Sequence, residues 1–254
     1  MKTKTLQLFL LAVLFTFSSC SNDDEKKEAY VKKIVSTSSA TPSANQTIDF
    51  VYNSKKRIFN YTITKSSGSI SHDIIYNSSG LITKINRTST SASTSQLTSF
   101  IYSYTDGKLS KLEIADETGI TNYSMDFTYD EAQNKYLGDD NDGYVIEIRM
   151  DANENIKQFV VGSENSVMSY NANSGLFKNT KNNVPLLLTH FFSSESTSRY
   201  LLQLFANKEI SSIEAVTTTL YATTTRDENN LITQIDYSNS SSSIFSMDVT
   251  YENR

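Results

Sequence analysis

Cys20 is the residue with the clearest chemistry, because it is the one cysteine in the 254-residue chain. It follows two serines and an apolar run from Leu6 to Phe17, which two lysines precede. The run is too short to span a bilayer as a helix and has the size of the apolar part of a secretory signal. A thiol at this place can take a diacylglyceryl group, and several acyl chains on one residue anchor a protein stably. Cys20 is therefore a candidate lipidation site.

The surroundings of Cys20 resemble a bacterial lipoprotein signal and predict a signal peptide over residues 1–19. One departure is Phe17, which stands three residues before the cysteine, where leucine is usual. The alternative is an ordinary cleaved signal with a coincidental cysteine. Lipidation explains why the chain has a single cysteine, since proteins of oxidising compartments usually have an even number of cysteines, paired in disulfides.

Residues 20–29 are predicted to form a lipidated, acidic tether. Residues 21–25 read SNDDE, which resembles the export signal that Bacteroidetes lipoproteins use to reach the outer face of the outer membrane. We therefore expect a lipid-anchored protein at the cell surface, with the periplasmic face of the outer membrane as the alternative. The same stretch would also suit a solvated linker.

No metal or cofactor site is predicted. Zinc needs three or four close ligands, and the two histidines, His72 and His190, are far apart in the sequence; we interpret both as structural. The acidic loop at residues 138–143 could be read as a calcium site. An EF-hand loop aligned on Gly143 has Gly138 at its first position and Arg149 at its last, where carboxylates are required, so the match fails. We interpret this loop as a hairpin turn, with adventitious calcium as the alternative.

The motif search favours a protein that is not an enzyme, and no catalytic residue is predicted. The chain has no GxSxG, P-loop or GxGxxG motif. Paired carboxylates for sugar hydrolysis meet only in space, so a hydrolase stays open as a less favoured function. The net charge of −5 becomes more negative when the signal lysines are removed, and this argues against nucleic acid as a partner.

The composition is that of an all-β protein, because Thr, Tyr and Phe favour strands while Asn and Ser favour turns. A hairpin unit repeats along the chain: a long side chain, then Asn or Asp, then a polar turn, then an apolar residue six positions after the first. The spacing joins Tyr52 to Ile58, Tyr76 to Ile82, Met150 to Ile156 and Arg226 to Ile232. A further apolar residue follows three positions later. We expect Gly or Asn at the positive-φ position of each turn; chance matches in a β-rich chain are the alternative.

The pattern Tyr-Asn/Asp-x-x-Gly-x-Leu/Ile-x-x-Ile is similar to the YD-type hairpin repeat of large bacterial surface proteins. The whole layout resembles a group of uncharacterised Bacteroidetes outer-membrane lipoproteins with a porin-like β-meander. This resemblance implies a single domain over residues 30–254, an antiparallel meander that forms an open or partly closed barrel-like sheet. It implies no activity.

A helical insertion is predicted near residues 183–208. Asn183 can cap a helix and Pro185 suits a first turn, and two apolar sets recur at helical spacing, the second beginning at Tyr200. Such short helices would cover the sheet or plug one end of the barrel; docking on a partner is the alternative. Polar residues 36–47 are expected to form a loop after a first strand.

These observations favour a non-catalytic binding module for glycan or peptide ligands, held to the membrane by its lipid anchor. Sheet faces rich in Tyr, Ser and Asn combine rigid aromatic contacts with adaptable hydrogen bonds. The alternative is a structural or accessory lipoprotein that associates with an outer-membrane protein assembly.

Overall fold

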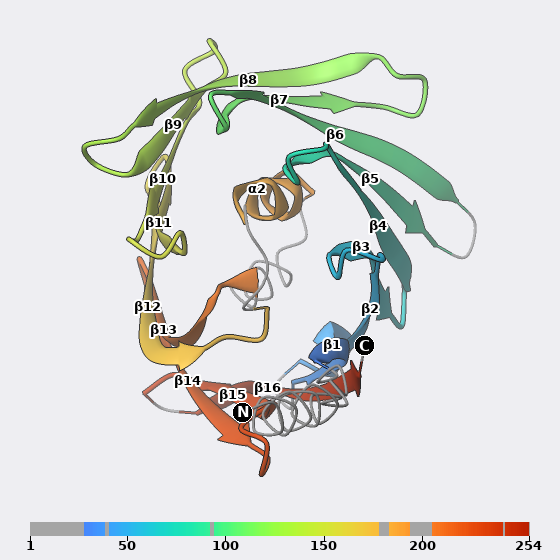
Figure 1. The fold of residues 1–254 in the computed structure, drawn as a ribbon, viewed down its shortest axis with the longest axis vertical. Helices are drawn as coiled ribbons and strands as arrows, with labels where there is room; N and C mark the ends of the chain where they lie inside the picture. The colour runs from blue at the N-terminus through green and yellow to red at the C-terminus, as the bar shows by residue number, and fades with distance from the viewer. Residues whose placement is uncertain are drawn as a thin grey trace, which may run out of the picture. The chain divides into compact units, whose positions relative to one another are not determined.

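The computed structural model describes residues 28–38, 41–91, 94–177, 183–193, 205–240 and 242–253. Val31–Tyr251 belong to one compact unit, which holds the barrel; residues 28–30 and 252–253 belong to a second, small unit. In Figure 1 the strands form a ring, and one helix lies inside it.

Sixteen antiparallel strands within the described residues make up the sheet, each beside its neighbours in the chain. The strands are β1 (Ala29–Thr37), β2 (Gln46–Tyr52), β3 (Ile58–Lys65), β4 (Gly68–Tyr76), β5 (Ile82–Thr90), β6 (Ser95–Thr105), β7 (Lys108–Ala115), β8 (Thr121–Asp130), β9 (Lys135–Asp139), β10 (Val145–Met150), β11 (Ile156–Val161), β12 (Glu164–Ser174), β13 (Lys208–Ala215), β14 (Thr218–Arg226), β15 (Ile232–Ser238) and β16 (Ser243–Asn253). The predicted all-β meander is confirmed. The expectation of an open or partly closed sheet is wrong, because β1 and β16 lie side by side and close the barrel. Closure removes the unpaired edges that a flat sheet would leave.

The two residues that lie six positions apart in each repeat form a pair across neighbouring strands. The four pairs that face each other are Tyr52–Ile58, Tyr76–Ile82, Met150–Ile156 and Arg226–Ile232. A β-bulge follows each pair; in β5, for example, Thr83 has no partner in the register. In a regular strand, residues three apart point to opposite faces. The bulge turns both Ile82 and Ile85 into the barrel, where each is completely buried.

A turn connects the two residues of each pair, and the side chain of the first residue of that turn holds it in place. Asn53 Oδ1 accepts the backbone N–H groups of Lys55 and Arg57 at 3.0 and 3.1 Å, and Asp227 accepts two in the same way. The positive-φ residues of the four turns are Lys56, Gly80, Glu154 and Asn230. The expectation of Gly or Asn is wrong at Lys56 and Glu154, where the capped turn and the bulge impose the conformation on a side chain that disfavours it. We call this end of the barrel the repeat rim.

Tyrosine hydroxyls join successive hairpins along the repeat rim. Each donates to the backbone carbonyl of the strand that precedes its own. These hydrogen bonds run from Tyr52 to Val31, Tyr76 to Ile58, Tyr104 to Ile82, Tyr170 to Ile156 and Tyr251 to Ile232, at 2.6–2.9 Å. The tyrosine of the repeat therefore satisfies a rim carbonyl and packs its ring into the barrel at the same time.

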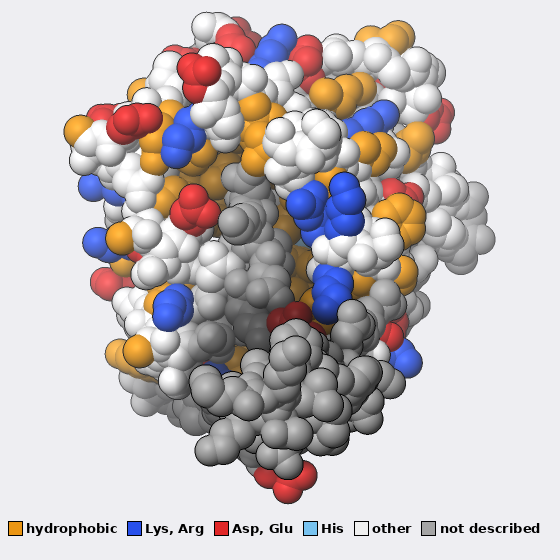
Figure 2. Space-filling model, in the orientation of Figure 1, with side chains coloured by type: hydrophobic (Ala, Val, Ile, Leu, Met, Phe, Trp, Pro, Cys, Tyr) orange, Lys and Arg blue, Asp and Glu red, His pale blue; other side chains and the backbone are white. Residues whose placement is uncertain are grey.

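The barrel is apolar inside and polar outside. Phe50, Tyr61 and His72 form a row across β2, β3 and β4, and all three are buried. On the next row, which faces outward, Asn60 Nδ2 donates to Asp73 Oδ1 at 2.7 Å. Barrels that span a bilayer show the reverse pattern, with apolar side chains outward. On the face that Figure 2 shows, acidic and basic side chains are interspersed, with no large field of one sign.

Helix α2 (Val184–Phe192) lies in the lumen, and its residues 184–190 are all buried. Pro185 stands in the first turn, where its missing N–H costs nothing. Tyr102 donates to the Pro185 carbonyl at 2.7 Å, and the Tyr61 hydroxyl lies 2.7 Å from His190 Nε2. In the described residues no helix is long and apolar enough to cross a membrane.

The predicted helical insertion is longer than the helix that the structure describes. Residues 194–204, including Tyr200, lie outside the described residues, and β13 already begins at Lys208. The predicted loop at 36–47 is also shorter than expected. β1 continues to Thr37, a 3-10 helix spans Pro42–Ala44, and β2 begins at Gln46.

Candidate functional site

A pocket of about 210 Å³ opens at the lumen mouth on the repeat rim. It lies where the β4–β5, β6–β7, β8–β9 and β10–β11 turns meet the first residue of α2. Its lining includes Gly107, Lys108, Tyr129, Asn134, Tyr136, Glu154 and Val184. We call it the rim pocket. Its volume is below that of pockets for drug-sized ligands, so it suits one ring-sized group.

Two tyrosines form the aromatic wall of the rim pocket. Tyr129 and Tyr136 lie opposite each other on β8 and β9, with ring centroids 4.7 Å apart. The Lys108 ammonium lies 4.1 Å from the centroid of the Tyr129 ring, a cation–π arrangement. Tyr136 is buried and Tyr129 is half-buried. Lys108 and Tyr136 therefore hold the Tyr129 ring in place, and part of that ring stays exposed.

Asn134 fixes the floor of the rim pocket. Its Nδ2 donates to the carbonyls of Met150 and Asp151 at 3.2 and 2.9 Å, and the Tyr129 hydroxyl donates to its Oδ1. Its backbone lies in the left-handed region, with φ of 49°, which Asn tolerates better than most residues. These bonds tie the β8–β9 turn to the end of β10 and set the position of the Tyr129 ring.

The charged groups of the rim pocket are balanced. Lys108 and Glu154 are its lining residues with formal charge among those described. Burial, and then the neighbouring Tyr129, raise the pKa of Tyr136 to about 12, against a smaller opposing effect of the Leu109 backbone. Tyr136 is therefore a neutral phenol at pH 7, and the pocket offers one cation, one anion and neutral hydrogen-bonding groups.

The two histidines meet inside the barrel. His72 stacks on Tyr61 with ring centroids 4.3 Å apart, and its ring centroid lies 5.1 Å from that of His190. Burial, then His190 and Arg87, hold the pKa of His72 well below its ordinary value, while the Tyr61 backbone acts in the opposite direction. The described residues hold no cluster of three or more potential metal ligands. The pair packs α2 against the wall. This contact could not be predicted from the sequence, because 117 intervening positions separate the two residues.

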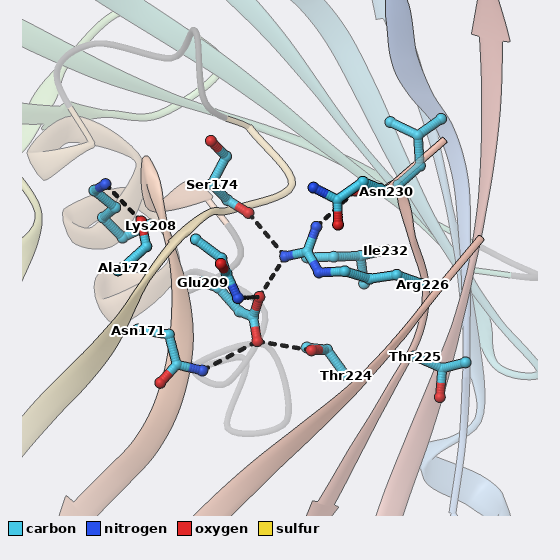
Figure 3. A network of polar contacts seen from close by, with 12 residues as sticks. Asn171, Ala172, Ser174, Lys208, Glu209, Thr224, Thr225, Arg226, Asn230 and Ile232 are labelled. Carbon is cyan, nitrogen blue, oxygen red and sulfur yellow. Dashed lines mark hydrogen bonds and ion pairs between the residues drawn. The ribbon is translucent and has the colours of Figure 1, made fainter. Parts of the chain in front are cut away.

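Glu209 anchors a second polar network that we did not predict (Figure 3). It contacts the Arg226 guanidinium and accepts hydrogen bonds from Asn171 at 3.1 Å and Thr224 at 2.7 Å. Arg226 also donates to the Ser174 carbonyl at 3.2 Å. The hydrogen bonds hold the pKa of Glu209 below its ordinary value, although burial alone would raise it and is the largest single effect. This network joins β12, β13 and β14 where the chain leaves the wall for the lumen, a structural role.

A more apolar cavity of about 60 Å³ lies deeper in the lumen. It lies between α2 and the inner faces of β11 and β12, lined by Phe159, Met168, Leu187 and Phe191 among others. Phe191 also contacts Phe159 and Phe192, with ring centroids 5.1 Å apart in both pairs. This volume is small, and the lining is part of the packing of the helix.

Of the sites considered from the sequence, Cys20 lies outside the described residues and the acidic loop lies within them. Cys20, the signal peptide over 1–19 and most of the tether lie outside the described residues, so lipidation stays a prediction. The acidic loop is a hairpin turn between β9 and β10, in which Asp140 Oδ1 accepts the N–H groups of Asp142 and Tyr144, each at 3.0 Å. The rim pocket was missed. Its one sequence signal was Tyr129-Asp130, which reads as another copy of the repeat.

Comparisons with known proteins identify the fold. The chain resembles a crystal structure of a porin-like protein from Bacteroides uniformis, with 16% sequence identity, a TM-score of 0.52, and coverage of 87% of this chain and 96% of that one. A porin-like protein from Bacteroides vulgatus matches with 11% identity, a TM-score of 0.40, and coverage of 89% and 99%. No family model and no curated protein matches. The first likeness supports a porin-like barrel fold, as the sequence resemblance implied; the lipoprotein family and the YD repeat stay predictions.

Proposed function

We propose that this protein is a lipid-anchored, non-catalytic binding protein of the outer membrane, which takes a glycan or peptide ligand in the rim pocket. The signal around Cys20 supports the anchor, and the porin-like neighbour from Bacteroides uniformis supports the outer membrane. The polar outer wall supports a barrel that lies in water beside the membrane, because charged side chains on a lipid-facing wall cost about 2–4 kcal/mol each near the bilayer centre.

The rim pocket is the observation that carries the binding role. It is concave, has an aromatic wall of two tyrosines, and is built around four turns on a rigid barrel, which is the usual construction of a ligand site. Tyr129 combines a large contact surface with few rotatable bonds, and Lys108 and Asn134 already restrain it. Such a site loses little entropy on binding.

Binding is favoured over hydrolysis by the pocket lining. Glycoside hydrolysis uses two carboxyl groups about 5–10 Å apart. Among the described residues that line the rim pocket, Glu154 supplies the single carboxylate.

The test is binding by the full lipidated chain, purified in detergent and applied to glycan and peptide arrays. We expect Tyr129→Ala to abolish the signal. Tyr221→Ala is the matched control, because Tyr221 is 52% exposed on β14 of the outer wall, and it should bind as the wild type does. Loss in both variants, or no binding to either array by a folded wild type, contradicts the proposal.

An accessory role in a membrane assembly is the second candidate, and exposed apolar side chains favour it. Val51, Phe59 and Ile75 are 45%, 49% and 45% exposed on the adjacent strands β2, β3 and β4. Large exposed apolar patches often mark protein contacts. Crosslinking in the native envelope tests this role: a specific partner lost in Phe59→Lys supports it, and an unchanged pattern removes it.

A further inference from the structure

We infer that the ligand of the rim pocket is a neutral sugar ring of a glycan, and that the ring packs against Tyr129. This inference rests on the proposed function and narrows it. Glycans and peptides make different demands on a site, and the contacts in the rim pocket distinguish them.

The charge balance of the pocket selects a neutral ligand. Lys108 lies against the Tyr129 ring and Glu154 also belongs to the pocket lining, so neither sign dominates. A site for a phosphorylated or uronic acid ligand would need an excess of cationic groups, and a site for a basic peptide would need an excess of carboxylates. Tyr136 adds no charge, because its pKa is raised to about 12.

The aromatic wall fits the apolar face that a sugar ring presents through its C–H groups. Tyr129 and Tyr136 meet at a tilt of 51° with their centroids 4.7 Å apart, so they form an aromatic corner whose two rings contact each other. A sugar ring packs on the outer side of this corner, and a volume of about 210 Å³ takes one unit of a longer chain, with its neighbours outside the mouth.

The polar groups surround this aromatic corner, as hydroxyl-rich ligands require. Glu154 accepts hydrogen bonds and Lys108 donates them, so a sugar hydroxyl, which both donates and accepts, can meet either. Glu154 occupies the left-handed conformation at φ of 61°, in a turn that Asp151 Oδ1 holds through the N–H of Asn155 at 2.8 Å. A peptide with an apolar anchor would instead need a deep apolar recess. The apolar cavity between α2 and strands β11 and β12 is smaller, at about 60 Å³.

The experiment is isothermal titration of the full detergent-solubilised chain with four probes. These are neutral tetrasaccharides (cello-, malto- and manno-oligosaccharides), a tetragalacturonate, a chitosan tetramer and a mixture of short peptides. We expect at least one neutral tetrasaccharide to bind, with an affinity that changes less than about twofold between 50 and 500 mM salt, because screening weakens only charged contacts. Tyr129→Ala should weaken binding at least tenfold, Tyr129→Phe less than about threefold, and Tyr221→Ala not at all.

The outcomes separate the two proposals. Peptide binding that Tyr129→Ala abolishes, without neutral sugar binding, overturns the sugar inference and leaves the binding function in place. Preference for the charged sugars, or strong salt dependence, also overturns the inference. No binding by a wild type with an intact thermal transition overturns both. A Tyr129→Ala variant that binds neutral sugars as the wild type does places their site elsewhere and contradicts the inference.

Discussion

The Tyr76 hydroxyl donates a 2.7 Å hydrogen bond to the backbone carbonyl of Ile58, and so joins the end of β4 to the start of β3. Burial raises the pKa of this tyrosine to about 12, against an opposing effect of Arg57, so the donor persists through the physiological range. The same bond recurs around the repeat rim. The tyrosine of the repeat thus forms a contact between successive hairpins, while the rest of the repeat forms contacts within one hairpin.

Tyr76→Phe tests this relationship, since it removes the donor and keeps the ring. We expect a loss of about 0.5–1.5 kcal/mol in the free energy of unfolding, which corresponds to a fall in Tm of about 2–4 °C per kcal/mol in a domain of this size. Thermal unfolding followed by circular dichroism measures it. Tyr221→Phe on the outer wall is the control; equal shifts in both variants would show that the rim bond contributes nothing.

Lys56→Gly is expected to stabilise the protein. Lys56 has φ of 62°, a conformation that costs a residue with a Cβ about 1–2 kcal/mol, and the greater flexibility of glycine in the unfolded chain offsets part of that gain. The net effect should be a stabilisation below about 1 kcal/mol, measured by urea unfolding. Gly119→Ala is the reciprocal change, because Gly119 has φ of 83° with open space around its missing Cβ. We expect it to destabilise the fold; a shift in the same direction in both variants would contradict the backbone explanation.

The repeat could be predicted from the sequence because Tyr76 and Ile82 are close along the chain and both carry their structural preference locally. Closure of the barrel could not, since β1 and β16 meet across the length of the chain and local spacing is the same in an open sheet. The rim pocket was hidden for a related reason. Lys108 begins β7, Tyr129 lies near the end of β8 and Glu154 lies in the β10–β11 turn, and no local pattern joins the three.

Acid should destabilise the barrel through His72. The pKa of His72 is held well below the ordinary value of 6.5 in the folded state. Below about pH 6.5 the unfolded chain therefore binds more protons than the folded protein does, and the free energy of unfolding falls as the pH falls. For one proton the slope is at most about 1.4 kcal/mol per pH unit. In His72→Phe, which keeps a ring against Tyr61, the difference in urea midpoint between pH 7 and pH 5 should shrink. A pH dependence equal to that of the wild type would assign the effect to other groups.

Cys20→Ser tests the predicted anchor. The thiol is the attachment point of the lipid, so the variant should lose incorporation of labelled palmitate and leave the membrane fraction. The measurement is labelling of the bacterial host followed by fractionation, with Ser21→Ala as the control that should behave as the wild type. Palmitate incorporation that survives in Cys20→Ser would refute lipidation at this residue.

The most direct test of the central claim is hydrogen exchange of the full chain with and without a saturating oligosaccharide that titration identifies. A ligand in the rim pocket should slow exchange in the turns that carry Gly107, Asn134 and Glu154, and leave the opposite turns near Asp116 and Tyr144 unchanged. Protection confined to those opposite turns, or to the outer wall, would contradict the assignment of the rim pocket as the binding site.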